Sequence, residues 1–138
     1  NRLNNRQDMA QYGIIYIIHN EQQGHDVFKV GKSSRPVEER LKELNSDTSL
    51  IGQFVHKHSF LVKDIDDAEK KSHDVLVEYR IQDNREFFKI DYDNLKKKVF
   101  KAVEDFMITH SDIIDANEDI DNIESSWYRA IIKKRSKT

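Results

Sequence analysis

The stretch that decides the fold runs from Gly13 to Arg40 and reads GIIYIIHNEQQGHDVFKVGKSSRPVEER. Residues 14–18 form a β-branched and aromatic run, which is typical of a buried strand. A polar insert around Gly24 suits a hairpin loop, and the apolar residues 27–30 follow as the partner strand. Pro36 then predicts the first turn of a helix, because proline fits that position and two glutamates follow it. The predicted order is strand, turn, strand, helix.

The rest of the chain extends this pattern. Residues 50–62 predict a third strand, and residues 86–90 predict a short one. Asp64 is expected to cap a second helix, and Asp93 begins another. Apolar or small side chains recur in the second helix at helical spacing, at Ile65, Ala68, Ser72, Leu76 and Tyr79. The fold class is therefore α/β: a small central, mainly antiparallel three-stranded sheet flanked by helices, with a helical C-terminal extension.

A length of 138 residues suggests one domain with an appendage. We expect a flexible leader over residues 1–12, the folded domain over residues 13–108, and an acidic linker with a C-terminal helix and basic tail over residues 109–138. The chain has no cysteine, which excludes disulfides and thiolate metal sites. It shows no secretory signal and no apolar run of membrane-spanning length. A soluble, cytoplasmic protein without a membrane partner is expected.

The formal net charge is −2, which by itself argues mildly against a nucleic-acid-binding protein. Much of the acidity comes from the segment Glu104–Glu124, which contains no Lys or Arg. The remainder can therefore carry a local basic face. Binding to DNA through charge is expected to be modest and sensitive to salt.

Three polar side chains occupy positions in the predicted strands and helix where an apolar residue would pack as well. Tyr16 lies in the middle of the first strand, and Lys29 is a charge inside an apolar strand. Arg40 follows Val37 by three residues, so it can lean over the apolar face of its helix. Each has an ordinary structural explanation: a buried tyrosine, a snorkelling lysine, a surface arginine. Their convergence on one sheet surface predicts a phosphate site.

Glu69 and His73 add a candidate metal site on the second helix. Glu69 follows the inward-facing Ala68, so it is expected to point toward the edge of the sheet. A hard carboxylate suits Mg²⁺ or Mn²⁺, although a lone glutamate on a helix is more often only solvated. His73 comes four residues later on the same face and can orient a water, bind phosphate or join the metal.

The Gly-x-x-Tyr strand, the Lys-Val-Gly-Lys strand and the arginine nine residues after that glycine resemble the GIY-YIG nuclease superfamily. More narrowly, the chain is similar to the branch whose second motif reads KIG, found in phage-encoded proteins and in meiotically up-regulated gene 113-like domains. The resemblance covers residues 13–90. It implies a metal-dependent DNA endonuclease, with DNA as its partner and a phage or mobile element as its setting.

The resemblance also implies roles. Tyr16 would act as or assist the general base, and Lys29 would lower the pKa of Tyr16 or hold the attacking water. Arg40 would bind the scissile phosphate, and Glu69 would bind Mg²⁺ or Mn²⁺. Further phosphate or DNA contacts are expected from Lys32, Ser33 and Arg35. These roles require one cluster, with Glu69 on the same side of the sheet as Tyr16.

Two other functions remain open. Some members of this branch are described mainly as DNA-binding domains, so a non-catalytic DNA-binding module on the same fold is one alternative. A protein-interaction adaptor that uses Glu104–Glu124 and a helix around Trp127 is the other. A homodimer is also considered, because a small nuclease with one site needs dimerisation or rebinding to cut two strands. Glu86 is expected to be structural, paired with Arg80 or Arg85.

Overall fold

The computed structural model describes residues 12–49, 51–81 and 86–108. It contains one four-stranded sheet in the order β3-β1-β2-β4, and every pairing is antiparallel. The strands are β1 (Gly13–His19), β2 (Val27–Ser33), β3 (Val55–Val62) and β4 (Phe87–Lys89). The helices are α2 (Val37–Asn45), α3 (Ile65–Val75) and α4 (Tyr92–Val103), with short 3-10 turns η1 (Glu21–Gln23), η2 (Val77–Tyr79) and η3 (Glu104–Phe106). The α/β class is confirmed.

The structure differs from the sequence-based expectations in detail. The sheet has four strands rather than three, because the short segment of β4 pairs with residues 27–29 of β2. The third strand begins at Val55, and α3 ends at Val75, so Tyr79 falls in η2. Asp64 does precede α3, but its φ is 53° and its side chain makes no capping hydrogen bond. The predicted leader, apart from Tyr12, and the predicted segment 109–138 lie outside the described residues.

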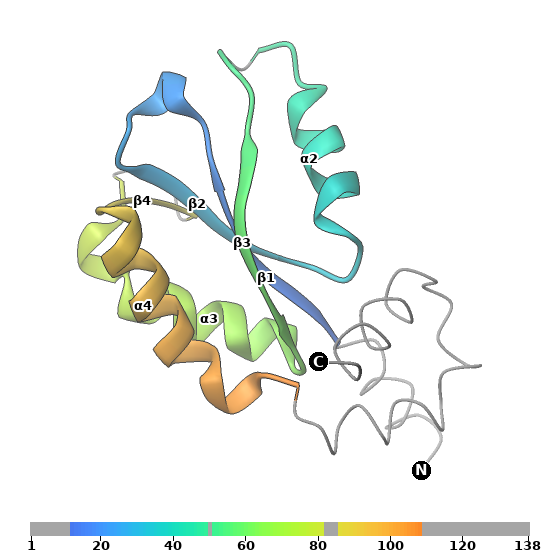
Figure 1. Ribbon diagram of the computed structural model, residues 1–138, viewed down its shortest axis with the longest axis vertical. Coiled ribbons are helices and arrows are strands. Elements are labelled where there is room, and N and C mark those ends of the chain that lie inside the picture. The colour runs from blue at the N-terminus through green and yellow to red at the C-terminus, as the bar shows by residue number, and fades with distance from the viewer. Residues whose placement is uncertain (1–11, 50, 82–85, 109–138) are drawn as a thin grey trace.

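The central strand β1 is buried on both faces, which explains its unbroken apolar run. Ile15 and Ile17 point to the face covered by α3 and α4, whereas Ile14, Tyr16 and Ile18 point to the face covered by α2. Figure 1 shows α3 and α4 lying together, apart from α2. None of the described helices is long and apolar enough to span a membrane.

Two hydrophobic cores result from this layering. The α3/α4 core is the larger and includes Ile15, Ile17, Phe28, Val30, Phe60, Val62, Ile65, Ala68, Leu76, Phe88, Leu95 and Val99. The α2 core consists of Ile14, Tyr16, Ile18, Val37, Phe54, Leu61 and Ile108, with Tyr12, Leu41, Leu44 and Phe87 packed against it. The apolar stripe of α2, formed by Val37, Leu41 and Leu44, therefore faces the sheet.

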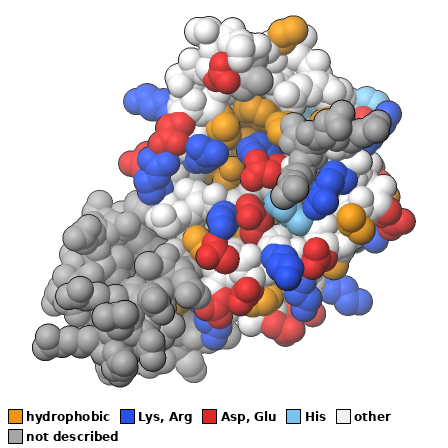
Figure 2. Space-filling view, turned by 180° about the vertical axis from the view of Figure 1, so that it is seen from behind, with side chains coloured by type: hydrophobic (Ala, Val, Ile, Leu, Met, Phe, Trp, Pro, Cys, Tyr) orange, Lys and Arg blue, Asp and Glu red, His pale blue; other side chains and the backbone are white. Residues whose placement is uncertain are grey.

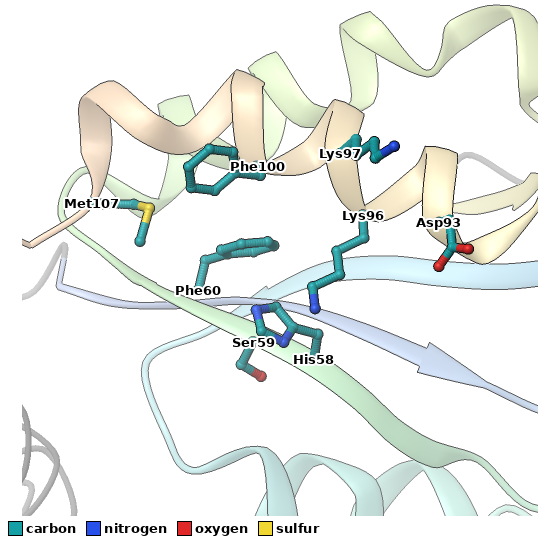
Figure 3. Close-up of a pocket in the computed structure, with 8 residues that line it drawn as sticks. All are labelled: His58, Ser59, Phe60, Asp93, Lys96, Lys97, Phe100 and Met107. Carbon is teal, nitrogen blue, oxygen red and sulfur yellow. The ribbon is translucent and has the colours of Figure 1, made fainter.

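A groove of about 680 Å³ lies between α4 and β3, on the face of the sheet opposite Tyr16. Phe60 forms its floor and is nearly buried, while Phe100 on α4 is 44% exposed. Lys96 and Lys97 from α4 also line it (Figure 3). The predicted site residues lie elsewhere, so this groove is separate from the candidate active site.

Tyr16 lies across Gly31, its partner in the β1–β2 register. A Cβ atom at residue 31 would lie 2.5 Å from the tyrosine hydroxyl oxygen and 2.7 Å from the ring carbon that bears it. Tyr16 is 1% exposed, so its ring has little room to move aside. Glycine is needed here for close approach, since its side-chain volume is occupied by the tyrosine.

We therefore predict that Gly31→Ala lowers the free energy of unfolding by about 1–3 kcal/mol through overpacking. Urea denaturation followed by circular dichroism measures this directly. In a Tyr16→Phe background the cost should shrink, because the closest atom, the hydroxyl oxygen, is gone. Equal cost in both backgrounds would contradict the account.

Candidate active site

Lys29 and Tyr16 share the α2 face of the sheet. Lys29 pairs in register with Ile18 on β1 and with Phe87 on β4, both of which belong to that face. The lysine is 4% exposed, and its Nζ lies 5.5 Å from the centre of the Phe87 ring. It forms an ion pair with Glu86. A buried ammonium is tolerated because a carboxylate and an aromatic face replace its water.

Arg40 reaches the same place from α2. Its guanidinium donates a hydrogen bond to the Tyr16 hydroxyl, since arginine has only donors. Burial raises the pKa of the Tyr16 hydroxyl above its ordinary value, while Arg40 opposes that rise. Lys29 was expected either to lower this pKa or to hold the attacking water. In the structure Arg40 lowers the pKa, and Glu86, the partner of Lys29, acts in the opposite direction.

Glu43 holds both arginines on the outer side of α2. Its carboxylate lies 2.5 Å from Arg35 Nη1 and 3.1 Å from Arg40 Nη1. Arg35 first, and Arg40 after it, hold the pKa of Glu43 below its usual range. Arg40 thus spans Tyr16 on one side and Glu43 on the other. All three of these charged groups are at least one-third exposed, so a phosphate can approach them.

Glu69 lies on α3, whereas the face of the sheet that carries Tyr16 is covered by α2. Because α3 packs on the opposite face, a single cluster of Glu69 with Tyr16 stays a prediction. The Glu69 side chain is 18% exposed, and its Oε1 lies 3.9 Å from Lys32 Nζ. Its charge still acts on Tyr16, where it raises the pKa of the hydroxyl.

His73 and Ser33 form hydrogen bonds to the backbone and have structural roles. The Nε2–H of His73 donates to the Val30 carbonyl at 2.7 Å, at the side of β2 that faces β4. The His73 ring also lies 5.4 Å from that of Phe88. The Ser33 hydroxyl donates to the Arg35 carbonyl at 2.9 Å and accepts from the Arg35 N–H at 3.0 Å. These contacts fix α3 against β2 and shape the turn before α2.

Lys32 stands between two carboxylates of α3. It forms an ion pair with Asp66 and lies 3.9 Å from Glu69. Asp66 is the main reason that the pKa of Lys32 is raised. Figure 2 shows Lys, Arg, Asp and Glu side chains gathered with a histidine beside exposed hydrophobic surface on the side of the molecule behind that of Figure 1.

The chemistry of these residues fits a magnesium-type ion better than zinc. Within residues 12–49, 51–81 and 86–108, no group of three or more His, Cys, Asp or Glu side chains is placed to hold a metal. Mg²⁺ does not need such a group, because it keeps several waters and is commonly held by one or two carboxylates and a substrate phosphate. Glu69, half-buried and beside Lys32, is a suitable carboxylate.

Sequence reasoning missed the acidic partners of the site. Glu86 was expected to pair with Arg80 or Arg85, and its ion pair with Lys29 was not predicted; Asp66 and Glu43 were not singled out. The backbone carbonyl of Glu86 also accepts a hydrogen bond from the Val30 N–H at 3.0 Å, which continues the β2–β4 pairing. The motif Arg-Glu-Phe-Phe was the available signal, since it places Glu86 directly before Phe87 on the short strand.

Comparison with known proteins identifies the domain. The model of the T5orf172 domain matches residues 13–105, which includes every strand and helix described above. Neither the curated proteins nor the solved structures gave a match. The match covers more than half of the chain and extends over Tyr16, Lys29, Arg40 and Glu69. This chain therefore belongs to the T5orf172 domain family, a GIY-YIG-related family.

Proposed function

We propose that this chain is a metal-dependent DNA endonuclease that hydrolyses phosphodiester bonds at the site around Tyr16. The observation that carries the proposal is the contact between Arg40 and the Tyr16 hydroxyl above Gly31. A tyrosine that served packing alone would not need an arginine directed at its oxygen and a glycine beneath it. Membership of a GIY-YIG-related family supports the same function.

The chemistry assigned to the chain is attack by water on phosphorus. Tyr16, as the phenolate, takes the proton of the attacking water, and the bond from phosphorus to the leaving oxygen breaks. The leaving oxygen takes a proton from solvent, so the products are a phosphate monoester and a free hydroxyl. Glu69 would hold Mg²⁺ or Mn²⁺, which would supply Lewis-acid stabilisation of the phosphate oxygens.

Arg40 and Lys29 have separate tasks in this scheme. The planar guanidinium of Arg40 offers two aligned donors to the non-bridging oxygens, where negative charge develops. Its hydrogen bond to Tyr16 also holds the base next to that phosphate. Lys29 is nearly buried and fixed by Glu86, so it supplies positive charge from beneath the site without large motion.

We predict metal-dependent nicking or linearisation of supercoiled plasmid DNA in Mg²⁺ or Mn²⁺. Glu69→Gln and Arg40→Ala should each reduce the rate by about 10²-fold or more, because each removes a group that acts on the transition state. Asp67→Asn on α3 and Lys42→Ala on α2 are the matched controls. Both residues are exposed, and these variants should retain activity within a few-fold.

Plasmid binding without nicks, unchanged by Glu69→Gln, would instead favour a non-catalytic DNA-binding module. Absence of both binding and cleavage would rule out the proposal in either form. Thermal melts of each variant separate loss of chemistry from loss of folding.

The pH dependence tests the role of Tyr16. The pKa of its hydroxyl is raised above the usual value of about 10, so the phenolate is scarce at neutral pH. If the phenolate is the base, its fraction rises about tenfold per pH unit between pH 7 and 9. The logarithm of the cleavage rate should then increase with a slope near +1. A flat profile would mean that Tyr16 acts in its neutral form, as a donor to phosphate.

A further inference from the structure

The basic side chains at the candidate site contact carboxylates of the same chain. Lys29 binds Glu86, Lys32 binds Asp66, and both Arg35 and Arg40 bind Glu43. A DNA phosphate that enters the site therefore competes with these carboxylates. Lys32 is distinctive among them, because Asp66 and Glu69 both face it and Glu69 is the metal ligand of the proposed function.

We propose that Asp66 withholds Lys32 from DNA phosphate until a divalent cation neutralises the Asp66–Glu69 side of α3. Metal binding and DNA binding would then reinforce each other through one lysine. Asp66 is thus a positioning residue that acts through Lys32, and the ligands concerned are Mg²⁺ and a backbone phosphate. This inference rests on the proposed function.

The geometry supports an exchange of partners. Asp66 and Glu69 are three residues apart on α3, so their carboxylates are neighbours on one helix face. Without a cation between them they would repel each other. Lys32 serves as that cation in the structure, with its Nζ bonded to Asp66 and 3.9 Å from Glu69. A divalent ion with oxygen ligands satisfies both carboxylates better than one ammonium and leaves the lysine free.

The pair is also weak enough to exchange. The side chains of Lys32 and Asp66 are 38% and 72% exposed, and ion pairs in such solvated positions contribute little to stability. The Lys29–Glu86 pair differs, because Lys29 is only 5% exposed there and its release would leave a charge buried. Lys32 pairs with Ile15 and so lies on the α3 face with Asp66 and Glu69, and the Glu86 charge that acts on Tyr16 also acts on Lys32. Because coupling between two ligands is reciprocal, DNA should increase the affinity for metal by the same factor by which metal increases the affinity for DNA.

Fluorescence anisotropy of a labelled DNA duplex tests this without relying on cleavage. All proteins carry Tyr16→Phe, so that the duplex stays intact. Asp66→Asn is compared with Asp67→Asn, because both remove one negative charge from the first turn of α3 but Lys32 contacts only Asp66. Without metal, Asp66→Asn should bind DNA about threefold more tightly than Asp67→Asn, since it frees one cation. Its affinity should fall more steeply with salt, by about one phosphate contact.

Two further anisotropy measurements complete the test. In a Lys32→Gln background the difference between Asp66→Asn and Asp67→Asn should disappear. Mg²⁺ should increase the DNA affinity of the Asp67→Asn protein by more than that of the Asp66→Asn protein. Equal affinities of the two variants without metal, or a difference that survives Lys32→Gln, would overturn the inference while leaving the proposed function standing. If the parent protein fails to bind DNA at all, both fall.

Discussion

The hydroxyl of Tyr16 is held by a steric constraint from below and a charge from the side. Gly31 leaves the space in which the oxygen lies, because a single carbon added there would come within 2.5 Å of it. Arg40 then donates to that oxygen from α2. The β1–β2 register sets the first contact, and the packing of Val37, Leu41 and Leu44 against the sheet sets the second. Disturbing either the register or the helix moves the group on which the chemistry depends.

Charge balance is the second feature of the site. Cations that would bind a phosphate are a liability in a folded protein without ligand, because they repel one another in a confined space. Here Glu86, Asp66 and Glu43 offset them. The ion pairs differ in burial, so the two lysines, Lys29 and Lys32, have different roles. Lys29 is buried and stays paired with Glu86, whereas the exposed Lys32–Asp66 pair can exchange.

Much of this was accessible from the sequence, for identifiable reasons. The apolar runs around Tyr16 and Lys29 predicted two strands, and Pro36 with the glutamates after it predicted the helix that presents Arg40. The face on which α3 packs was not predictable, because a helical stripe shows which side is apolar but not which face of a sheet it covers. The fourth strand is only three residues long, so its own pattern was too short to place it in the sheet. Lys29 and its partner Glu86 are 57 positions apart in the sequence, and Lys32 and its partner Asp66 are 34 apart. The spacing of apolar residues along the chain does not predict contacts over such separations.

The most direct test of the account is a titration of Tyr16 by carbon-13 NMR, with tyrosine labelled at the carbon that bears the hydroxyl. The chain has five tyrosines, and the spectrum of Tyr16→Phe assigns the signal. The account predicts a pKa for Tyr16 above the usual value of about 10, and a further rise in Arg40→Ala, because the arginine no longer stabilises the phenolate. A Tyr16 pKa at or below the usual value, or one that Arg40→Ala leaves unchanged, would show that the two side chains do not form a single site.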